Sequence, residues 1–366
     1  MEIRTGSDIN GILVQKYCID NPPPNTLKVE SYEVWIGHGK TSVDTAFSGY
    51  WVAHQGIDSI VDVFQERNNV LCSESSPDCY CGVAGRSTKI VGGRETGVGE
   101  YPWQVGFNYI HSREPNYCGG SLINNLWILS AAHCFDGVQD ARTRYPASWV
   151  VYLGEHDYQD NTETDRIVAY IELIRNHPHY YHRTTNYDFS LIKMRTPIDF
   201  LSNPHIRPIC LPTSDENNYE NYNAVVTGWG ATAGGIPARK LQEAAVMVIS
   251  NTECKRAYRD LYPHHLNDQN LCARAPGRDS CQGDSGMSGY LSELSLQILF
   301  TTGGPLITAG HGSGRVPGEN YELIGVVSWG EGCADHRYPG VYARVTQQLG
   351  WIRENTDVGT KSCPRK

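Results

Sequence analysis

The sequence predicts an all-β protein that carries a small β-rich fragment at its N-terminus. Its 366 residues include 22 tyrosines, 37 glycines and 19 prolines, a composition typical of many short strands joined by turns. The length corresponds to about two domains, and a hydrophobic fraction of 40% is enough to build a sizeable core. We therefore expect short strands over most of the chain.

Charge and cysteine content narrow the class of function. The net charge of −9, with no run of basic residues, argues against nucleic acids and acidic membranes as partners. No apolar stretch is long enough to span a bilayer. The 12 cysteines indicate an oxidising compartment, so we expect a secreted, extracellular protein. Residues 1–16 lack the apolar centre of a signal peptide, and we expect the natural N-terminus to lie further upstream.

Residues 1–53 form the first predicted segment. Alternation in 27–30 and 33–36 predicts two strands, and Phe47-Ser48-Gly49-Tyr50 matches a closing strand. In these features the segment resembles the second half of a CUB domain, a β-sandwich adhesion module. The alternative is a linker without regular structure, which Asn21-Pro22-Pro23-Pro24-Asn25 favours. Residues 54–89 are interpreted as a linker and activation propeptide, with helical character near 60–64.

Three separated motifs carry the chemistry: Ala131-Ala132-His133-Cys134, Asp188-Phe189-Ser190-Leu191-Ile192 and Asp279-Ser280-Cys281-Gln282-Gly283-Asp284-Ser285-Gly286. A serine hydroxyl is a poor nucleophile at neutral pH and needs an adjacent base, a role that suits histidine because its pKa lies near working pH. A buried aspartate can fix the histidine tautomer. Each residue alone has an ordinary explanation as a core histidine, a turn aspartate or a loop serine. Together they predict a catalytic triad of His133, Asp188 and Ser285.

With these motifs, the chain resembles the trypsin-like serine proteases from residue 90 to about residue 355. The resemblance implies a protease domain over 90–366, with two antiparallel six-stranded β-barrels and a C-terminal helix near 345–353. His133 and Asp188 would come from the first barrel and Ser285 from the second. The backbone N–H groups of Gly283 and Ser285 would form the oxyanion hole.

The resemblance also predicts the specificity of cleavage. Asp279 matches the residue at the base of the primary pocket, where a carboxylate selects a substrate Lys or Arg. Gly330 and Gly340 match the positions that leave this pocket open. Ser328-Trp329-Gly330 matches the segment that pairs with the substrate backbone. The alternative for Asp279 is a solvated turn residue.

Lys89-Ile90-Val91-Gly92-Gly93 resembles the activation junction of a zymogen. Cleavage after Lys89 would free the α-amine of Ile90, and the resemblance implies that this amine then pairs with Asp284. A plain transition from strand to turn is the alternative. The activating enzyme must accept Lys, so we expect another trypsin-like protease, or this one, to act upstream.

Residues 287–303 interrupt the resemblance. The family continues after the nucleophile as Gly-Asp-Ser-Gly-Gly-Pro-Leu, whereas here Gly286 is separated from Gly304-Pro305-Leu306 by 17 residues. One interpretation is a retained intron or an error in the gene model, since long inserts without regular structure are uncommon in compact domains. The other is a real insertion, which would press on the wall of the specificity pocket and impair catalysis.

Family matching implies four disulfides: Cys118–Cys134, Cys254–Cys272, Cys281–Cys333 and Cys81–Cys210, the last of which would hold the propeptide after activation. The partners of Cys18, Cys72, Cys79 and Cys363 stay open. A zinc site at Cys72, Cys79 and Cys81 has no convincing fourth ligand nearby.

We expect no required cofactor. Glu155, Asp157 and Asp165 resemble the calcium loop of the family, and an acidic surface loop without metal is the alternative. His177, His179 and His182 are interpreted as ordinary loop residues. The expected partners are protein substrates, an activating protease and serpin-type inhibitors. The predicted function is a zymogen of a serine endopeptidase that cuts after Lys or Arg in an extracellular cascade; the alternative is a catalytically impaired homologue that acts as a binding protein.

Overall fold

The computed structural model describes the backbone of six short strands before residue 77 and, in full, residues 80–85, 94–112, 118–160, 162–230, 238–274, 303–308, 320–331 and 337–356. The chain divides into two compact units, Met1–Ser76 and Pro77–Lys366. Each unit is described by itself below.

The first unit contains two three-stranded antiparallel sheets. One has the order β2-β1-β4, with β1 Glu2–Thr5, β2 Ile12–Lys16 and β4 Val34–Gly37. The other has the order β3-β6-β5, with β3 Thr26–Val29, β5 Trp51–Val52 and β6 Ser59–Asp62. The helical character expected near 60–64 was wrong for residues 60–62, which extend in β6 because they pair with two neighbouring strands. The resemblance to a CUB domain stays a prediction.

The second unit begins with a closed six-stranded barrel in the order β10-β13-β12-β11-β8-β9. Its strands are β8 Gln104–Tyr109, β9 Cys118–Leu122, β10 Trp127–Ser130, β11 Trp149–Leu153, β12 Ile167–Asn176 and β13 Ser190–Met194. Aromatic rings fill its centre, where Phe135 lies 5.2 Å from Phe107 and 4.8 Å from Trp149 between ring centroids. Burial of such rings stabilises the barrel that holds the candidate site.

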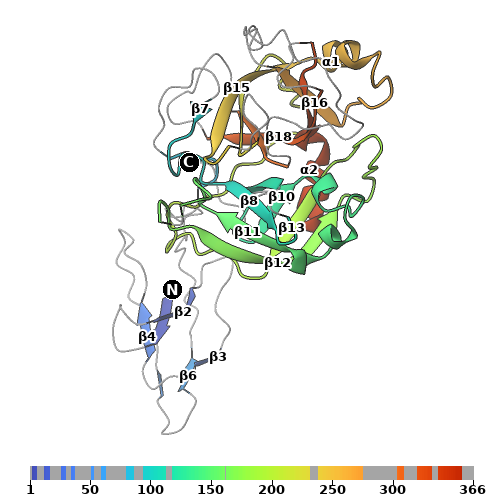
Figure 1. The fold of residues 1–366 in the computed structure, drawn as a ribbon. Helices are drawn as coiled ribbons and strands as arrows, with labels where there is room; N and C mark the ends of the chain where they lie inside the picture. The colour runs from blue at the N-terminus through green and yellow to red at the C-terminus, as the bar shows by residue number, and fades with distance from the viewer. Residues whose placement is uncertain are drawn as a thin grey trace. The chain divides into compact units, whose positions relative to one another are not determined.

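A second barrel follows from the order β14-β17-β18-β19-β16-β15, because β14 also pairs with β15. Its strands are β14 Asn223–Gly228, β15 Gln242–Ile249, β16 Asn270–Arg274, β17 Pro305–Thr308, β18 Glu322–Trp329 and β19 Gly340–Arg344. The short strand β7, Arg94–Glu95, adds to the outer edge of β15. The prediction of two antiparallel six-stranded barrels is therefore confirmed, and Figure 1 shows their strands one above the other within this unit.

Two helices complete the second unit. Helix α1, Asn251–Tyr258, begins at Ser250, whose Oγ accepts a hydrogen bond from the N–H of Glu253 at 3.1 Å. Helix α2, Leu349–Asn355, follows the 3₁₀ turn η4, Val345–Gln348, and buries Leu349 and Ile352. The predicted C-terminal helix is confirmed, with its first turn in 3₁₀ geometry.

Three disulfides are present among the described residues, Cys81–Cys210, Cys118–Cys134 and Cys254–Cys272. They join the pairs that the family resemblance implies. Cys281 and Cys333 lie outside the described residues, as do Cys18, Cys72, Cys79 and Cys363. Among the helices that the structure describes, none has the length and apolar character needed to cross a membrane.

Candidate active site

His133 lies three residues after the end of β10, in the short 3₁₀ helix η1, Ala132–Cys134. All four residues of β10 are buried, and the disulfide from Cys134 to Cys118 ties the helix to β9. Ala132 and Cys134 are also buried, whereas 25% of the His133 side chain is exposed. The fold therefore fixes the backbone on both sides of an imidazole that solvent can still reach.

Asp188 lies two residues before the start of β13 and is completely buried. Its carboxylate accepts three hydrogen bonds: from His133 Nδ1 at 2.7 Å, from the backbone N–H of His133 at 2.9 Å, and from Ser328 Oγ at 2.6 Å. Ser328 belongs to β18, so the third donor comes from the other barrel. Donors to an ionised acceptor form stronger bonds than neutral pairs, which is how the buried charge is accommodated.

The pKa values of the pair follow from these contacts. Burial opposes the charge on Asp188, but the nearby His133 and the three donors hold the pKa of this carboxyl below its usual value. Burial likewise disfavours the imidazolium, and the Asp188 carboxylate overcomes it, so the pKa of His133 lies above its usual value. Because an ionised carboxylate only accepts, Nδ1 of His133 carries the proton. Nε2 then presents a lone pair, as a general base requires.

Asp136 is a second carboxylate near the imidazole. Its charge also raises the pKa of His133, although the structure shows no hydrogen bond between these two side chains. Asp136 instead accepts from the N–H of Val138 at 2.8 Å and from the hydroxyl of Tyr180 at 3.0 Å. The histidine is therefore influenced by one directly bonded and one more distant carboxylate.

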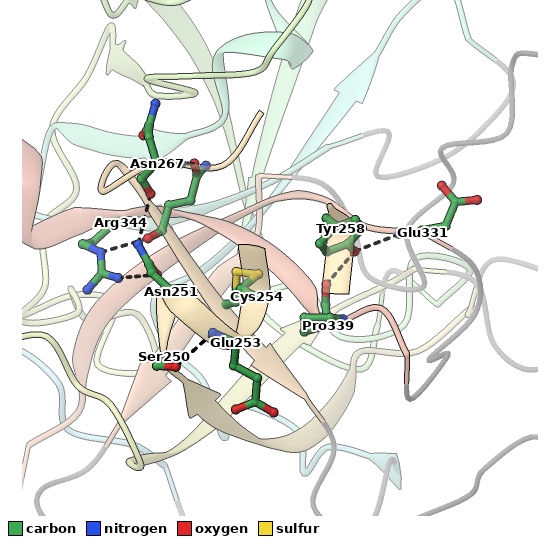
Figure 2. Close-up of a disulfide and its surroundings, with 11 residues drawn as sticks. Ser250, Asn251, Glu253, Cys254, Tyr258, Asn267, Glu331, Pro339 and Arg344 are labelled. Atoms are coloured by element: carbon green, nitrogen blue, oxygen red, sulfur yellow. Dashed lines mark hydrogen bonds between the residues drawn. A yellow bond between two sulfur atoms is a disulfide. The ribbon is translucent and has the colours of Figure 1, made fainter. Parts of the chain in front are cut away.

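The segments that match the substrate pocket meet beside helix α1. Gly330 directly follows β18 and Gly340 begins β19; a Cβ added to Gly330 would lie 3.8 Å from the Cα of Gly340. Tyr258 of α1 donates to the carbonyl of Pro339 at 2.7 Å and accepts from the N–H of Glu331 at 3.3 Å (Figure 2). One buried tyrosine thus joins the two segments that carry the glycines.

The ring of Trp329 lies against the same helix. Its centroid is 4.9 Å from that of Tyr258 and 5.4 Å from that of Tyr262, in edge-to-face geometry. These contacts hold the end of β18, where the sequence predicts pairing with a substrate backbone. The roles of the two tyrosines were not predicted from the sequence, where they are two among 22 tyrosines.

Several predicted site residues lie outside the described residues. They are Lys89, Ile90, Asp279, Gly283, Asp284 and Ser285. The chain is described again from Gly303, whose N–H donates to the carbonyl of Val327 at 2.9 Å. A Cβ on Gly303 would lie 2.5 Å from both the carbonyl oxygen of Gly119 and Ser130 Oγ. Its φ of +80° also favours glycine.

Gly303 therefore belongs to the framework, although the sequence analysis counted it as the last residue of the insertion. It leads through Gly304 into β17, which pairs with β14 and β18. Leu306 and Ile307 of this strand are fully buried. The strand that the family places after its nucleophile is thus supplied by residues 303–308.

Two of the three carboxylates of the predicted calcium loop form ion pairs with arginines. Buried Glu155 forms an ion pair with Arg166, and Asp157 pairs with Arg239 at 2.6 Å. The backbone carbonyl of Asp165 accepts from His205 Nε2 at 2.8 Å. This arrangement favours the alternative, an acidic loop without metal.

The loop that carries His177, His179 and His182 does not arrange these side chains to bind a metal ion. His177 stacks on Tyr187 with 4.8 Å between ring centroids, and burial lowers the pKa of His177 to about 4. Within the described ranges, no group of three or more His, Cys, Asp or Glu side chains is placed to hold a metal ion.

Comparison of the sequence with known proteins identifies the family. A family model described as trypsin matches residues 90–293 and 301–352. The chain belongs to the trypsin family. Transmembrane protease serine 9 of Rattus norvegicus is 38% identical over 282 residues, which cover 76% of this chain and 23% of that protein. The chain thus spans about a quarter of the length of this relative.

Trypsin-family membership gives a frame for the site. Trypsin-like serine endopeptidases need no cofactor, in agreement with the ion-paired loop described above. The family match stops after residue 293 and resumes at 301, inside the segment predicted as an insertion.

Ser328 was predicted only as part of the substrate-pairing segment, and its hydrogen bond to Asp188 was not predicted. The one hint in the sequence was that Ser328 is a polar residue next to the apolar residues of β18, where a buried hydroxyl needs a hydrogen-bond partner.

Proposed function

We propose that the chain is the zymogen of a serine endopeptidase, activated by cleavage after Lys89, that hydrolyses peptide bonds after Lys or Arg in an extracellular proteolytic cascade. The observation that carries this proposal is the set of hydrogen bonds from His133 and Ser328 to the buried Asp188. These bonds prepare the imidazole as a base, and membership of the trypsin family supplies the reaction.

In the proposed mechanism, Ser285 Oγ attacks the scissile carbonyl while His133 Nε2 accepts its proton. Asp188 stays ionised and stabilises the imidazolium that forms. The N–H groups of Gly283 and Ser285 bind the oxyanion, and each such donor contributes about 3–4 kcal/mol to the transition state. His133 then gives the proton to the leaving amine, and water hydrolyses the acyl-enzyme by the same steps in reverse.

Specificity is proposed to rest on Asp279, which would pair with the cationic end of a substrate side chain. Gly330 supports this, because a Cβ at this position would lie 3.8 Å from the Cα of Gly340, so a larger side chain would fill the space between the two segments. A Cβ on Gly340 would lie 3.2 Å from the ring of Tyr342. Tyr258 fixes those segments by bonding next to both glycines. A well-held slot with a charge at its base favours Lys and Arg over neutral side chains.

Activation and location are also proposed. The proposed activator is a trypsin-like protease that cuts after Lys89, and the freed amine of Ile90 would pair with Asp284. The disulfide Cys81–Cys210 would keep the propeptide attached after this cut. Three disulfides among the described residues support an extracellular location. The rat relative is named a transmembrane protease. Serpin-type proteins are the proposed inhibitors.

A second candidate function is a binding protein of protease fold that does not cut. The interruption of the family match at 294–300 favours it. Residues 286–302 separate the proposed nucleophile from Gly303, whereas the family joins these two positions directly. An insertion at this place would move Ser285 away from His133.

An active-site titration decides between these functions. The full chain is cleaved after Lys89 and mixed with a lysine ester that releases a chromogenic alcohol. We expect a stoichiometric burst that Ser285→Ala abolishes and that the control Ser288→Ala, three residues further along, leaves unchanged.

Mapping the acyl adduct by mass spectrometry identifies the nucleophile. An adduct on Ser285 supports the proposal, and one on Thr302, which directly precedes Gly303, would refute the assignment of Ser285. No burst from the full chain, with a burst from a variant lacking 286–302, would refute the first proposal and favour the second.

A further inference from the structure

We propose that the loop joining β12 to β13 is a site of proteolytic inactivation: a trypsin-like protease cuts the bond between Arg183 and Thr184, and the cut loosens the backbone that carries Asp188. The agent is a protease that cleaves after arginine, which on the proposed specificity includes a second copy of this chain. The chemistry is hydrolysis, in which water adds OH to the carbonyl carbon of Arg183 and H to the nitrogen of Thr184. The loss of activity rests on the proposed function, whereas the cut itself does not.

The loop is a short hairpin with an arginine near its tip. Tyr181 and Asn186 form an isolated antiparallel bridge, in which the N–H of Tyr181 donates to the carbonyl of Asn186 at 3.2 Å. Between them, the N–H of Thr184 donates to the carbonyl of Tyr181 at 3.2 Å. Exposed, polar loop tips of this kind are preferred sites of proteolytic nicking.

Arg183 is available to the pocket of a protease. It is exposed, and its side chain forms no hydrogen bond or ion pair with any residue that the structure describes. Arg239, by contrast, is held by Asp157 at 2.6 Å. Arg256 is also exposed, but it lies inside helix α1, whose backbone must unfold before it can pair with a protease as an extended strand. Arg183 therefore combines exposure, a loop backbone and an unpaired charge.

The backbone that follows Arg183 is strained. Thr185 and Tyr187 have φ values of +51° and +55°, in the left-handed region that residues with a Cβ rarely adopt. Two buried atoms, Thr184 Oγ1 and Asn186 Oδ1, have no hydrogen-bond partner in the part of the chain that the structure describes. Each feature costs free energy that the loop recovers on opening, which raises the population of the open form. Proteolysis of a rapidly opening segment follows that population.

The strained segment leads directly to the catalytic carboxylate. Tyr187 precedes Asp188, and the carbonyl of Tyr187 accepts from the N–H of Phe189 at 2.7 Å. The ring of Tyr187 stacks on His177 with 4.8 Å between the centroids. The hairpin closes this arrangement by tying the segment before Asp188 to the end of β12.

The cut removes the covalent closure that enforces this geometry. Thr184 becomes a charged N-terminus four residues before Asp188, and Tyr187 is free to return to a negative φ. A change of φ at Tyr187 turns the backbone that carries Asp188, so the carboxylate loses its alignment with the donors of His133 and Ser328. The general base then loses the partner that fixes its tautomer.

The cut is tested on the full chain carrying Ser285→Ala, which cannot cleave itself under the proposed mechanism. The chain is exposed briefly to immobilised trypsin, and new N-termini are quantified by mass spectrometry. We expect the terminus at Thr184 to form at least about tenfold faster than the terminus at Ala257, which follows the exposed Arg256 in helix α1. Arg183→Gln should abolish the first terminus and leave the second unchanged. Equal rates, or no cut after Arg183, would overturn the proposal.

The effect on Asp188 is measured in the same Ser285→Ala chain by NMR titration of His133. The carboxylate of Asp188 raises the pKa of His133 above its usual value. After the cut, this pKa should fall toward the usual value of about 6.5. The Arg183→Gln chain, treated identically, should keep the pKa of the uncut protein. A cut chain with an unchanged histidine pKa would overturn the inactivation.

The loss of activity is measured in the wild-type chain cut after Lys89. The chain is treated with immobilised trypsin, which is then removed, and kcat for the lysine ester is compared with the amount of the Thr184 terminus. We expect kcat of the nicked chain to be at least about tenfold lower, and Arg183→Gln to keep its kcat. A nicked chain with full kcat would overturn the inactivation alone. An uncut wild type without a burst would refute the proposed function, and the cut and the titration, which need no catalysis by this chain, would still decide this inference.

Discussion

Asp188→Asn replaces one oxygen of a side chain that accepts three hydrogen bonds by an NH₂ group. The amide has a single acceptor oxygen and cannot satisfy both the ring and the backbone N–H of His133 together with Ser328. If the NH₂ faces the imidazole, Nδ1 must accept and the proton moves to Nε2. The residue that should take a proton from Ser285 then presents a donor instead.

The expected loss can be estimated from this tautomer change. An inverted tautomer lowers kcat about 10⁴-fold, which corresponds to about 5.4 kcal/mol in the activation free energy. The direction in which the pKa of His133 departs from its usual value of about 6.5 should also reverse. Burial lowers this pKa, and the charge and hydrogen bonds of Asp188 now raise it above the usual value. Without the carboxylate, burial dominates and the pKa falls below it.

The assay combines kinetics with titration of the imidazole. The proposed mechanism requires neutral His133, so kcat/KM rises as the pH passes the pKa of this histidine. We expect the midpoint of this rise above about 6.5 in wild type and below about 6.5 in the variant. Asp136→Asn is the matched control, since Asp136 acts on His133 through charge without a hydrogen bond. We expect a small fall in pKa and a kcat within about tenfold of wild type. An Asp188→Asn enzyme with similar kcat, or an unchanged histidine pKa, would refute the reasoning.

Two further predictions concern the hydrogen bond from the second barrel and the propeptide. Ser328→Ala removes a bond to a buried charge and should cost about 1.5–3 kcal/mol in urea unfolding, whereas Ser130→Ala removes a 2.7 Å bond to a neutral carbonyl and should cost about 0.5–1.5 kcal/mol. Equal costs would mean that the carboxylate is not ionised. After cleavage behind Lys89, the two pieces should run together on a non-reducing gel and separate under reduction; separation without reductant would contradict the disulfide from Cys81 to Cys210.

The motifs around His133 and Asp188 could be recognised because each has a local signature, and the family resemblance that they support implied the two barrels. The sequence could not predict the bond from Ser328, because strands far apart in the sequence meet only after both barrels form. The acidic loop shows the same limit. The sequence placed Glu155 and Asp157 at a spacing that suits metal ligands, but it could not show that Arg166 and Arg239 form ion pairs with them in the folded protein. Strand β6 was mistaken for helix because a short apolar run fits either period.

The hydrogen bond from Ser328 spans the two barrels and ends on the charge of Asp188. This hydrogen bond therefore links the free energy of packing between the barrels to the ionisation of the Asp188 carboxylate. By reciprocity, any ligand that draws the barrels together makes Asp188 a stronger acid and steadies the imidazolium of His133. Any binder that separates them weakens the base without contacting it. The hydrogen bond from Ser328 thus couples the packing of the two barrels to the charge state of Asp188.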